Sequence, residues 1–208
     1  MAGFAVDINE LKQREAALNE QIALSDALAL QLRERADVDA LTSTKTRRAF
    51  LECAADEFQR ARRYGHPLSF VMLDVDAFKA VNDHRGHAAG DQVLARVATT
   101  CMGQLRAGID HCGRLGGEEF AILMPDTRIA GAKVFAERLC AAIRELKFDG
   151  GGQVFGVSVS IGVAMLAVID DDVAALMARA DEALYLAKGA GRDRVMVAGV
   201  LHAELLDT

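Results

Sequence analysis

The sequence predicts a mixed α/β (α+β) fold with a ferredoxin-like βαββαβ core, extra helices and a preceding N-terminal coiled-coil helix. Three features indicate this fold. A mostly apolar run from Leu68 to Asp76 is typical of a strand buried on both faces. Two glycines and two glutamates at 116–119, followed by apolar residues, indicate a β-hairpin. Apolar residues at helical spacing surround these strands, and a heptad pattern precedes them.

Length and composition are typical of one domain of ordinary size with an appendage. The chain has 208 residues, of which 51% are hydrophobic and only 2 are proline. This composition indicates a compact domain and argues against disorder. The formal net charge of −6 disfavours a protein that coats nucleic acid. It does not disfavour a nucleotide ligand, because a metal ion and a few cations can neutralise phosphates locally.

The four cysteines, Cys53, Cys101, Cys112 and Cys140, form no CxxC pair and no zinc-like group with histidine. We therefore expect buried free thiols, which are typical of a reducing cytoplasm. The sequence has no signal peptide and no apolar run near about 18 residues. We expect a cytoplasmic protein without a membrane span.

Residues 1–38 predict a signalling helix without internal proline or glycine after residue 4. Residues spaced seven apart form the a and d seam of a heptad repeat: Ile8, Glu15, Ile22, Ala29 and Ala36 in one series, and Leu11, Leu18, Ser25 and Leu32 in the other. We expect a parallel two-stranded coiled-coil stalk that holds a homodimer. Glu15 and Ser25 weaken this seam, which suits an adjustable stalk. The alternative is a single amphipathic helix packed on the domain.

The elements that follow alternate between helical and extended patterns. In order, we expect a hinge at Asp39–Arg48, a helix with apolar residues from Phe50 to Ala61, a stop near Tyr64–Pro67, the strand from Leu68, a helix at Ala88–Leu105, the hairpin, a helix at Ile129–Leu146, a strand at Val157–Val163, a helix at Val173–Lys188 and a strand at Arg194–Val197. This order of strands and helices predicts the ferredoxin-like core.

Carboxylates lie where two of the predicted strands end. Asp74 closes the buried strand, and Glu118 and Glu119 lie at the mouth of the hairpin. We place Gly116 and Gly117 at the two central positions of its turn. Adjacent glutamates repel each other, so a cation is their natural neutraliser, and hard oxygen ligands suit Mg²⁺ with a phosphate substrate. The alternative is a solvated turn with surface charges.

Taken together, the motifs resemble the GGDEF-domain diguanylate cyclases, whose signature is present in its GGEEF form at 116–120. The matching segments keep the family's order and spacing: Asp39–Thr42, Asp74–Lys79, Asn82–Asp83, Gly86–Asp91, Ser160–Val163, Ala180–Lys188 and Gly191–Val195. The resemblance implies a palm-type catalytic domain at 39–200, between the stalk at 1–38 and a C-terminal tail at 201–208.

The resemblance also implies a metal site. Asp74, the Val75 carbonyl and Glu118 match the metal-binding positions, which would hold two Mg²⁺ ions per half-site, with Mn²⁺ as an alternative. Glu119 matches a second metal contact or the base that accepts the 3′-hydroxyl proton. The assignment of the base between Glu118 and Glu119 stays open. Glu118, Glu119 and Lys79 are the expected catalytic residues.

Further matches imply how the nucleotide binds. Asn82 and Asp91 match the positions that read guanine, and a carboxylate can accept from guanine N1–H and N2–H₂. The other expected substrate-binding residues are the backbone at Ala77 and Phe78, the cations Lys79, Lys188 and Arg192, and His87, Gly116 and Gly117 at the substrate edge.

Two departures from the family pattern stand out. Residues 43–46 replace the expected glycine, leucine, proline and asparagine of the hinge, which leaves its coupling to the stalk open. In the product-binding RxxD motif, Asp110 is present but Ala107 occupies the arginine position, and Arg106 is one residue out of register. We expect this inhibitory site to be degraded.

The implied activity is the condensation of two GTP into cyclic di-GMP and two pyrophosphates by a dimer with one GTP half-site per subunit. The alternatives are an inactive GGDEF-like module that binds GTP or relays a signal, a structural dimerisation adaptor, and a cyclase for another dinucleotide, which Asp91 disfavours. An upstream sensor domain or partner would supply the input, which the sequence does not reveal.

Overall fold

The computed structural model describes residues 12–19, 21, 37–149 and 152–199. The chain divides into two units, Met1–Ala36 and Asp37–Thr208, and each is described by itself. In the first unit, residues 12–19 and 21 are helical, as the sequence predicts. Most of the heptad seam and the tail at 201–208 lie outside the described residues, so the coiled coil stays a prediction.

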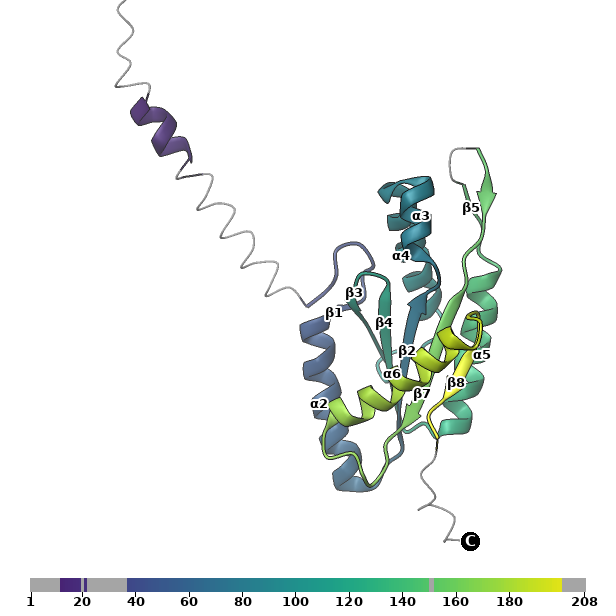
Figure 1. The fold of residues 1–208 in the computed structure, drawn as a ribbon. Helices are drawn as coiled ribbons and strands as arrows, with labels where there is room; N and C mark the ends of the chain where they lie inside the picture. Colours follow the sequence, from purple (N-terminus) through teal and green to yellow (C-terminus); the bar gives the residue numbers. More distant parts are fainter. Residues whose placement is uncertain (1–11, 20, 22–36, 150–151, 200–208) are drawn as a thin grey trace, which may run out of the picture. The chain divides into compact units, whose positions relative to one another are not determined.

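A six-stranded sheet forms the centre of the second unit, in the order β1–β3–β4–β2–β7–β8 (Figure 1). Its strands are β1 (Lys45–Thr46), β2 (Leu68–Val75), β3 (His111–Gly116), β4 (Glu119–Pro125), β7 (Val159–Met165) and β8 (Val195–Val197). β2 lies between β4 and β7 and is antiparallel to both. Strands β2, β3, β4 and β7 with their helices reproduce the predicted ferredoxin-like order, which is confirmed.

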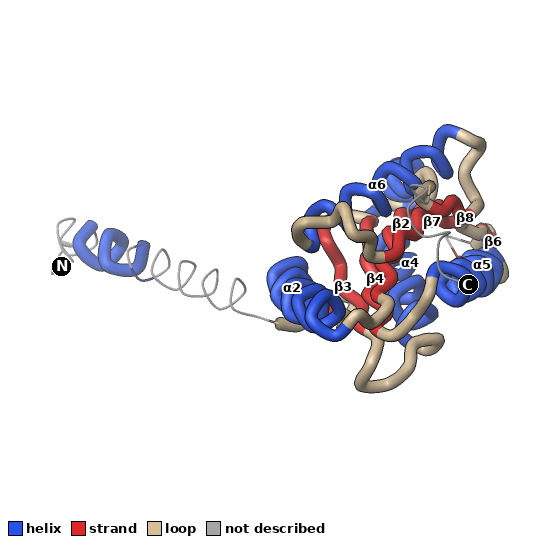
Figure 2. The backbone as a smooth tube through the Cα atoms, turned by 90° about the horizontal axis from the view of Figure 1, so that it is seen from below, coloured by secondary structure: helices blue, strands red, loops and turns tan. Residues whose placement is uncertain are grey.

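Helices cover both faces of this sheet (Figure 2). They are α2 (Arg47–Tyr64), α3 (Phe78–Arg85), α4 (His87–Met102), α5 (Ile129–Arg144) and α6 (Val173–Gly189). Side chains alternate along β2: Phe70 and Met72 join the apolar cluster of α2 and α6, whereas Val71 and Leu73 join that of α4 and α5. All of β2 is buried, as its continuous apolar run predicts.

Local sequence signals set the helix ends. The Thr46 hydroxyl accepts a hydrogen bond from the Ala49 N–H and begins α2, and Gly65 ends it in the left-handed conformation. The Asp172 carboxylate accepts from the Ala175 N–H in the same way at the start of α6. The predicted stop near Tyr64 is therefore confirmed.

A short hairpin of β5 (Phe148–Asp149) and β6 (Val154–Phe155) was not expected from the sequence. Each of its strands is too short to show the alternation of buried and exposed residues that identifies a strand in a sequence. The Phe148 and Phe155 rings pack with centroids 5.5 Å apart, and the guanidinium groups of Arg85 and Arg96 lie 5.5 Å from Phe155 and Phe148, respectively. These contacts fasten the hairpin to α3 and α4.

The thiols are free, as predicted, and Cys101, Cys112 and Cys140 are buried. Cys53 is half-buried, because it lies on α2 at the border of the face that packs on the sheet. No helix in the described part of the chain is long and apolar enough to cross a bilayer.

Candidate functional site

The predicted metal-binding residues and the two glutamates of the hairpin meet where β2 ends beside β3 and β4. Asp74 is only 8% exposed, and its Cα pairs with that of Glu119 in the β2–β4 ladder. The Val75 N–H donates to the Glu118 carbonyl at 3.3 Å. Antiparallel pairing therefore gathers residues that lie more than 40 positions apart in the sequence.

The turn of the hairpin lies one residue later than predicted. Gly116 ends β3 and pairs with Glu119, so Gly117 and Glu118 occupy the central positions. Gly117 has φ 51, a left-handed conformation that suits glycine. The pairing of β3 with β4 shifts register between Arg114 and Gly116, and this shift moves the turn. The alternation of apolar and polar residues in the sequence does not reveal such a shift. The Arg114 Nε donates to the Gly117 carbonyl at 2.9 Å and holds the turn.

Lys188 supplies a cation to this group of carboxylates. Its Nζ lies 2.8 Å from the Asp74 Oδ2, whereas the sequence led us to expect it on the phosphates. Burial raises the pKa of Asp74; the hydrogen bond and charge of Lys188 oppose this, and Glu118 and Glu119 add to it. Lys188 offsets one of three negative charges, so the site keeps an excess of negative charge that favours a further cation.

The donor set is chemically suited to Mg²⁺. Within the described residues, no group of three or more aspartate, glutamate, histidine or cysteine side chains could hold a metal ion by itself. The predicted set instead combines the Asp74 and Glu118 carboxylates with the Val75 carbonyl. Mg²⁺ usually takes one or two protein carboxylates and completes its shell with water and substrate phosphates. These residues therefore fit an ion that binds together with a triphosphate.

The turn from β2 into α3 is suited to an anion. Ala77 precedes α3 with φ 54 and ψ 29, and its carbonyl accepts from the N–H groups of Ala80 and Val81 at 2.9 and 3.3 Å. Phe78 is buried in the core, which anchors the first helical turn, and Lys79 is exposed. The first N–H groups of a helix lack acceptors within it and favour negative charge.

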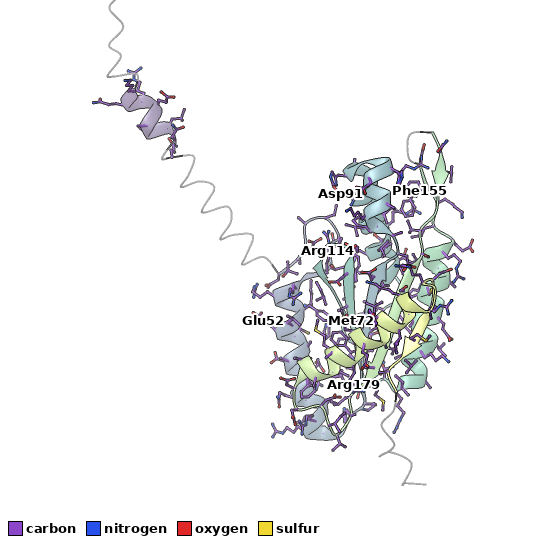
Figure 3. All side chains as sticks on the ribbon, in the orientation of Figure 1. Glu52, Met72, Asp91, Arg114, Phe155 and Arg179 are labelled. Carbon is purple, nitrogen blue, oxygen red and sulfur yellow. The ribbon has the colours of Figure 1, made fainter. Side chains whose placement is uncertain are left out.

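The two residues predicted to read guanine lie on the neighbouring helices α3 and α4. A Cβ at Gly90 would lie 2.0 Å from the Asn82 Oδ1 and 3.1 Å from the Phe78 ring, so the close approach of Asn82 to α4 requires glycine. Asp91 follows Gly90 and is exposed, as is His87 at the start of α4. Asp91 lies near the upper end of the domain and Arg179 near the lower (Figure 3).

Arg192 lies in the turn between α6 and β8 and lines a cavity of about 640 Å³. The cavity is also lined by Ala77, Asp76, Arg85, Arg144 and Ser158. Two positions that we expect to contact phosphates, Ala77 and Arg192, thus face one space. The same end of the domain carries the carboxylates, because Ala77 comes directly after β2.

Comparison with known proteins decides the family. The profile described as "Diguanylate cyclase, GGDEF domain" matches residues 36–194. The chain belongs to the GGDEF family. This confirms the family resemblance drawn from the motifs.

Relatives of this GGDEF domain are found in several bacteria. The chain is 40% identical to diguanylate cyclase DgcP of Pseudomonas aeruginosa over 166 residues, 80% of this chain and 24% of DgcP. It is 37% identical to response regulator PleD of Caulobacter vibrioides over 196 residues, 92% of this chain and 43% of PleD. The coiled coil and GGDEF domain of DgcB from Caulobacter crescentus, in complex with c-di-GMP, superposes with a TM-score of 0.75 at 28% identity, covering 90% of this chain and 99% of that one. The chain thus spans less than half the length of these two curated relatives.

At the RxxD position of this GGDEF domain, Arg106 contacts Asp110 on its own loop and the end of β4. Its Nη2 lies 2.5 Å from the Asp110 Oδ1 and 2.7 Å from the Pro125 carbonyl. The Asp110 side chain is only 1% exposed. The arginine that is one residue out of register therefore pairs with Asp110 and neutralises its charge.

Sequence reasoning missed residues that support the site. The sequence indicates no separate role for Asp76, which ends the apolar run of β2, or for Arg144 and Asp193. Gly90 belonged to a family motif, but its steric role was not evident. The signal for Asp76 was a charged residue at the end of a buried strand. Asp193 belonged to a family motif and Arg144 to none. Their contact gave no signal, because it joins residues 49 positions apart.

Proposed function

We propose that this chain is a diguanylate cyclase that condenses two GTP into cyclic di-GMP and releases two pyrophosphates. The observation that supports this most is the gathering of Asp74, Glu118 and Glu119 at the end of β2, directly before α3, which carries Asn82. The carboxylates that we propose to bind the metal and Asn82, which we propose to read guanine, thus adjoin the same strand-to-helix turn.

The nucleotide would be read and held by separate groups. The Asp91 carboxylate accepts from N1–H and N2–H₂ of guanine, a donor pattern that adenine lacks, and Asn82 adds an amide. The backbone at Ala77 and the cations Lys79, Lys188 and Arg192 hold the triphosphate, since paired cations and helix N–H groups both stabilise phosphate charge. We propose that His87, Phe78, Gly116 and Gly117 make further contacts with the substrate.

In the reaction, the 3′-hydroxyl of one GTP attacks the α-phosphorus of the other, and the bond to pyrophosphate breaks. The same step in the opposite sense closes the ring. Glu119 or Glu118 accepts the hydroxyl proton. Two Mg²⁺ ions, or Mn²⁺, held by Asp74, the Val75 carbonyl and Glu118 would supply stabilisation of charge on the attacking and leaving oxygens.

Each subunit would contribute one half-site, so the reaction requires a homodimer. We propose that residues 1–38 form the dimerising coiled coil, 39–200 the catalytic domain and 201–208 a tail. The solved DgcB structure is described as a coiled coil with a GGDEF domain, which supports this arrangement. The curated relatives extend well beyond the matched segment. We propose that an upstream sensor domain or a partner supplies the input. Buried free thiols favour a reducing cytoplasm.

The direct test is product analysis. Purified protein is incubated with GTP and Mg²⁺, and with ATP as a control, and the products are identified by mass. We expect cyclic di-GMP and pyrophosphate from GTP and no cyclic product from ATP. Binding of GTP without conversion would overturn the proposal and favour the inactive GTP-binding or signal-relay module.

A single substitution tests the catalytic group. Glu119→Gln is expected to lower turnover by roughly 10²-fold or more, because a general base or a metal contact is lost. The melting temperature should stay close to that of the wild type, since Glu119 is half-exposed. Glu182→Gln, at an exposed position on α6, is the matched control and should leave the rate unchanged. A Glu119→Gln rate above roughly a tenth of the wild-type rate would rule out both roles.

A further inference from the structure

The turn between α6 and β8 has an unusual backbone. Three successive residues have positive φ angles: 110° at Gly191, 61° at Arg192 and 49° at Asp193. Glycine adopts such values readily, but arginine and aspartate do so rarely. Left-handed residues of this kind persist only where neighbouring groups hold them, and they concentrate at functional sites. Contacts from two other elements hold this turn.

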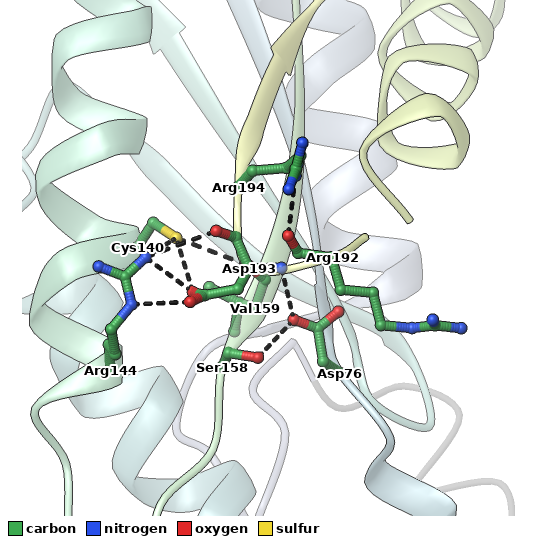
Figure 4. A network of polar contacts seen from close by, with 8 residues as sticks. All are labelled: Asp76, Cys140, Arg144, Ser158, Val159, Arg192, Asp193 and Arg194. Atoms are coloured by element: carbon green, nitrogen blue, oxygen red, sulfur yellow. Dashed lines mark hydrogen bonds and ion pairs between the residues drawn. The ribbon is translucent and has the colours of Figure 1, made fainter. Parts of the chain in front are cut away.

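The first contact comes from the last residue of α5. Arg144 binds Asp193 through two parallel hydrogen bonds, from Nε to Oδ2 at 2.8 Å and from Nη2 to Oδ1 at 2.9 Å (Figure 4). A bidentate arginine–carboxylate pair fixes orientation as well as distance. The Asp193 side chain therefore has a defined position relative to α5.

The second contact comes from the end of β2. The Asp193 N–H donates to the Asp76 Oδ2 at 3.1 Å. Asp76 is itself anchored, because its carboxylate accepts from the Ser158 hydroxyl at 2.7 Å and the Ser160 hydroxyl at 2.6 Å. Asp76 is 8% exposed and lies two residues after Asp74. The turn is thus tied to the end of the strand that carries Asp74, the proposed metal ligand.

The backbone of Arg192 is held within this turn. The Arg192 N–H donates to the Ala187 carbonyl at 3.0 Å, and its carbonyl accepts from the Arg194 Nε at 2.9 Å. Its side chain extends away from the pair of Arg144 and Asp193 (Figure 4) and lines the cavity that Ala77 and Arg144 also line. The backbone of the turn therefore sets the direction of the Cα–Cβ bond from which the Arg192 side chain extends toward this cavity.

We propose that Arg144 is a positioning residue: through Asp193 and Asp76 it directs Arg192 toward the terminal phosphates of the nucleotide. The pair of Arg144 and Asp193 then determines how strongly the site prefers a nucleoside triphosphate to the monophosphate. This inference rests on the proposed function, because it takes the bound nucleotide to be GTP. Arg192 meets the phosphates in the ground state as well as in the transition state, so its misplacement raises KM more than it lowers kcat.

The test compares two ligands by calorimetry. Guanosine 5′-[α,β-methylene]triphosphate carries the terminal phosphates but cannot react. A methylene group replaces the oxygen between the α- and β-phosphorus atoms, so pyrophosphate cannot leave. GMP carries the guanine contacts alone. Arg144→Ala should weaken binding of the triphosphate analogue roughly 5- to 30-fold and change GMP binding less than about twofold. In turnover, KM for GTP should rise by a similar factor.

A double-mutant cycle separates positioning from general stability. Arg192→Ala should weaken binding of the triphosphate analogue at least as much as Arg144→Ala does. The combination of Arg144→Ala with Arg192→Ala should bind no more weakly than Arg192→Ala alone, because Arg144 acts through Arg192. Arg144→Lys keeps the charge but loses the bidentate geometry, and should recover part of the affinity. It also serves if Arg144→Ala proves unstable.

Arg138→Ala is the matched control. Arg138 lies on the same helix and makes a hydrogen bond of 2.9 Å from its Nε to the Gln104 Oε1. Its loss should leave both ligands unaffected. Equal weakening of both ligands by Arg144→Ala, or effects that add to those of Arg192→Ala, would overturn the inference while leaving the proposed function in place. A wild-type protein that binds neither ligand would overturn both.

Discussion

Asp74 is a charged residue held where its surroundings disfavour its charge. Its side chain is 11% exposed, and burial is the main cause of its raised pKa. Lys188 offsets only part of this effect. Such conflict is typical of a site that is organised for a ligand, because a bound cation would relieve it.

Asp74→Asn should therefore raise the melting temperature at neutral pH while abolishing turnover. Because the pKa of Asp74 is higher in the folded than in the unfolded chain, ionised Asp74 destabilises the fold above its folded pKa. This cost disappears as the pH falls through that pKa, so the difference between variant and wild type should narrow on acidification. Thermal unfolding over a series of pH values measures it.

Asp76→Asn is the matched control for that experiment. Asp76 accepts hydrogen bonds from two hydroxyls and one backbone N–H, so its replacement by an amide should lower the melting temperature. If Asp74→Asn is less stable than the wild type at neutral pH, the ion pair of Asp74 with Lys188 stabilises the fold by more than burial of the Asp74 charge destabilises it.

Arg106 and Asp110 carry a second prediction at this scale. Because Arg106 neutralises Asp110 and Ala107 lacks a charge, cyclic di-GMP should not inhibit tightly and non-competitively with GTP. Initial rates at several GTP and product concentrations measure this. Asp110→Ala should leave the inhibition pattern unchanged. Tight non-competitive inhibition that Asp110→Ala removes would contradict the prediction.

At the scale of elements, the hinge before α2 is a turn organised by Asp39. The Asp39 Oδ1 accepts from the Thr42 N–H at 2.9 Å, from the Thr42 hydroxyl at 2.6 Å and from the Arg114 Nη1 at 3.4 Å. Thr46, one of the departures from the family pattern, caps α2. Arg114 also holds the signature turn through Gly117, so the hinge and the hairpin share one side chain.

Ser43 is the strained residue of this turn, with φ 58 at the position where the family pattern has glycine. Ser43→Gly should raise the free energy of unfolding by about 0.5–1 kcal/mol, because glycine adopts left-handed values without a steric penalty. Denaturant unfolding measures the change. Ser43→Ala keeps the Cβ and should give no gain. Equal stability of Ser43→Gly and Ser43→Ala would show that the turn is not strained.

At the scale of the whole molecule, activity depends on bringing two half-sites together. Deletion of residues 1–38 should lower specific activity steeply at low protein concentration, because association then depends on the catalytic domains alone. A high concentration of the truncated chain should restore part of the activity. The measurement is the initial rate of pyrophosphate release against enzyme concentration for both chains.

Replacement of Glu15 by Ile and Ser25 by Leu gives the opposite test, since apolar residues at these seam positions should tighten the dimer. Activity would then persist to lower protein concentration. If the full and truncated chains show the same concentration-independent specific activity, the stalk is not the dimerising element and the helix packs on the domain instead.

Much of the fold followed from patterns that are local in the sequence. The buried run of β2 and the helical spacing of α2, α4, α5 and α6 identified these elements, because packing against a sheet imposes a period on each of them. Three features were missed, because none of them leaves a period or a composition signal: strand β1 within the predicted hinge, the paired strands β5 and β6, and the bulge before Gly116. The role of each site residue stays a prediction.

The sequence by itself determined the family, the order of the elements and the residue types at the motif positions, since motifs and periods are properties of neighbouring residues. Only the tertiary structure decided which of these residues meet. The pairing of Lys188 with Asp74, and the link from Asp193 to Asp76 across 117 positions, depend on how β2, α6 and β8 assemble. Such contacts arise from packing of distant segments, and no local pattern encodes them.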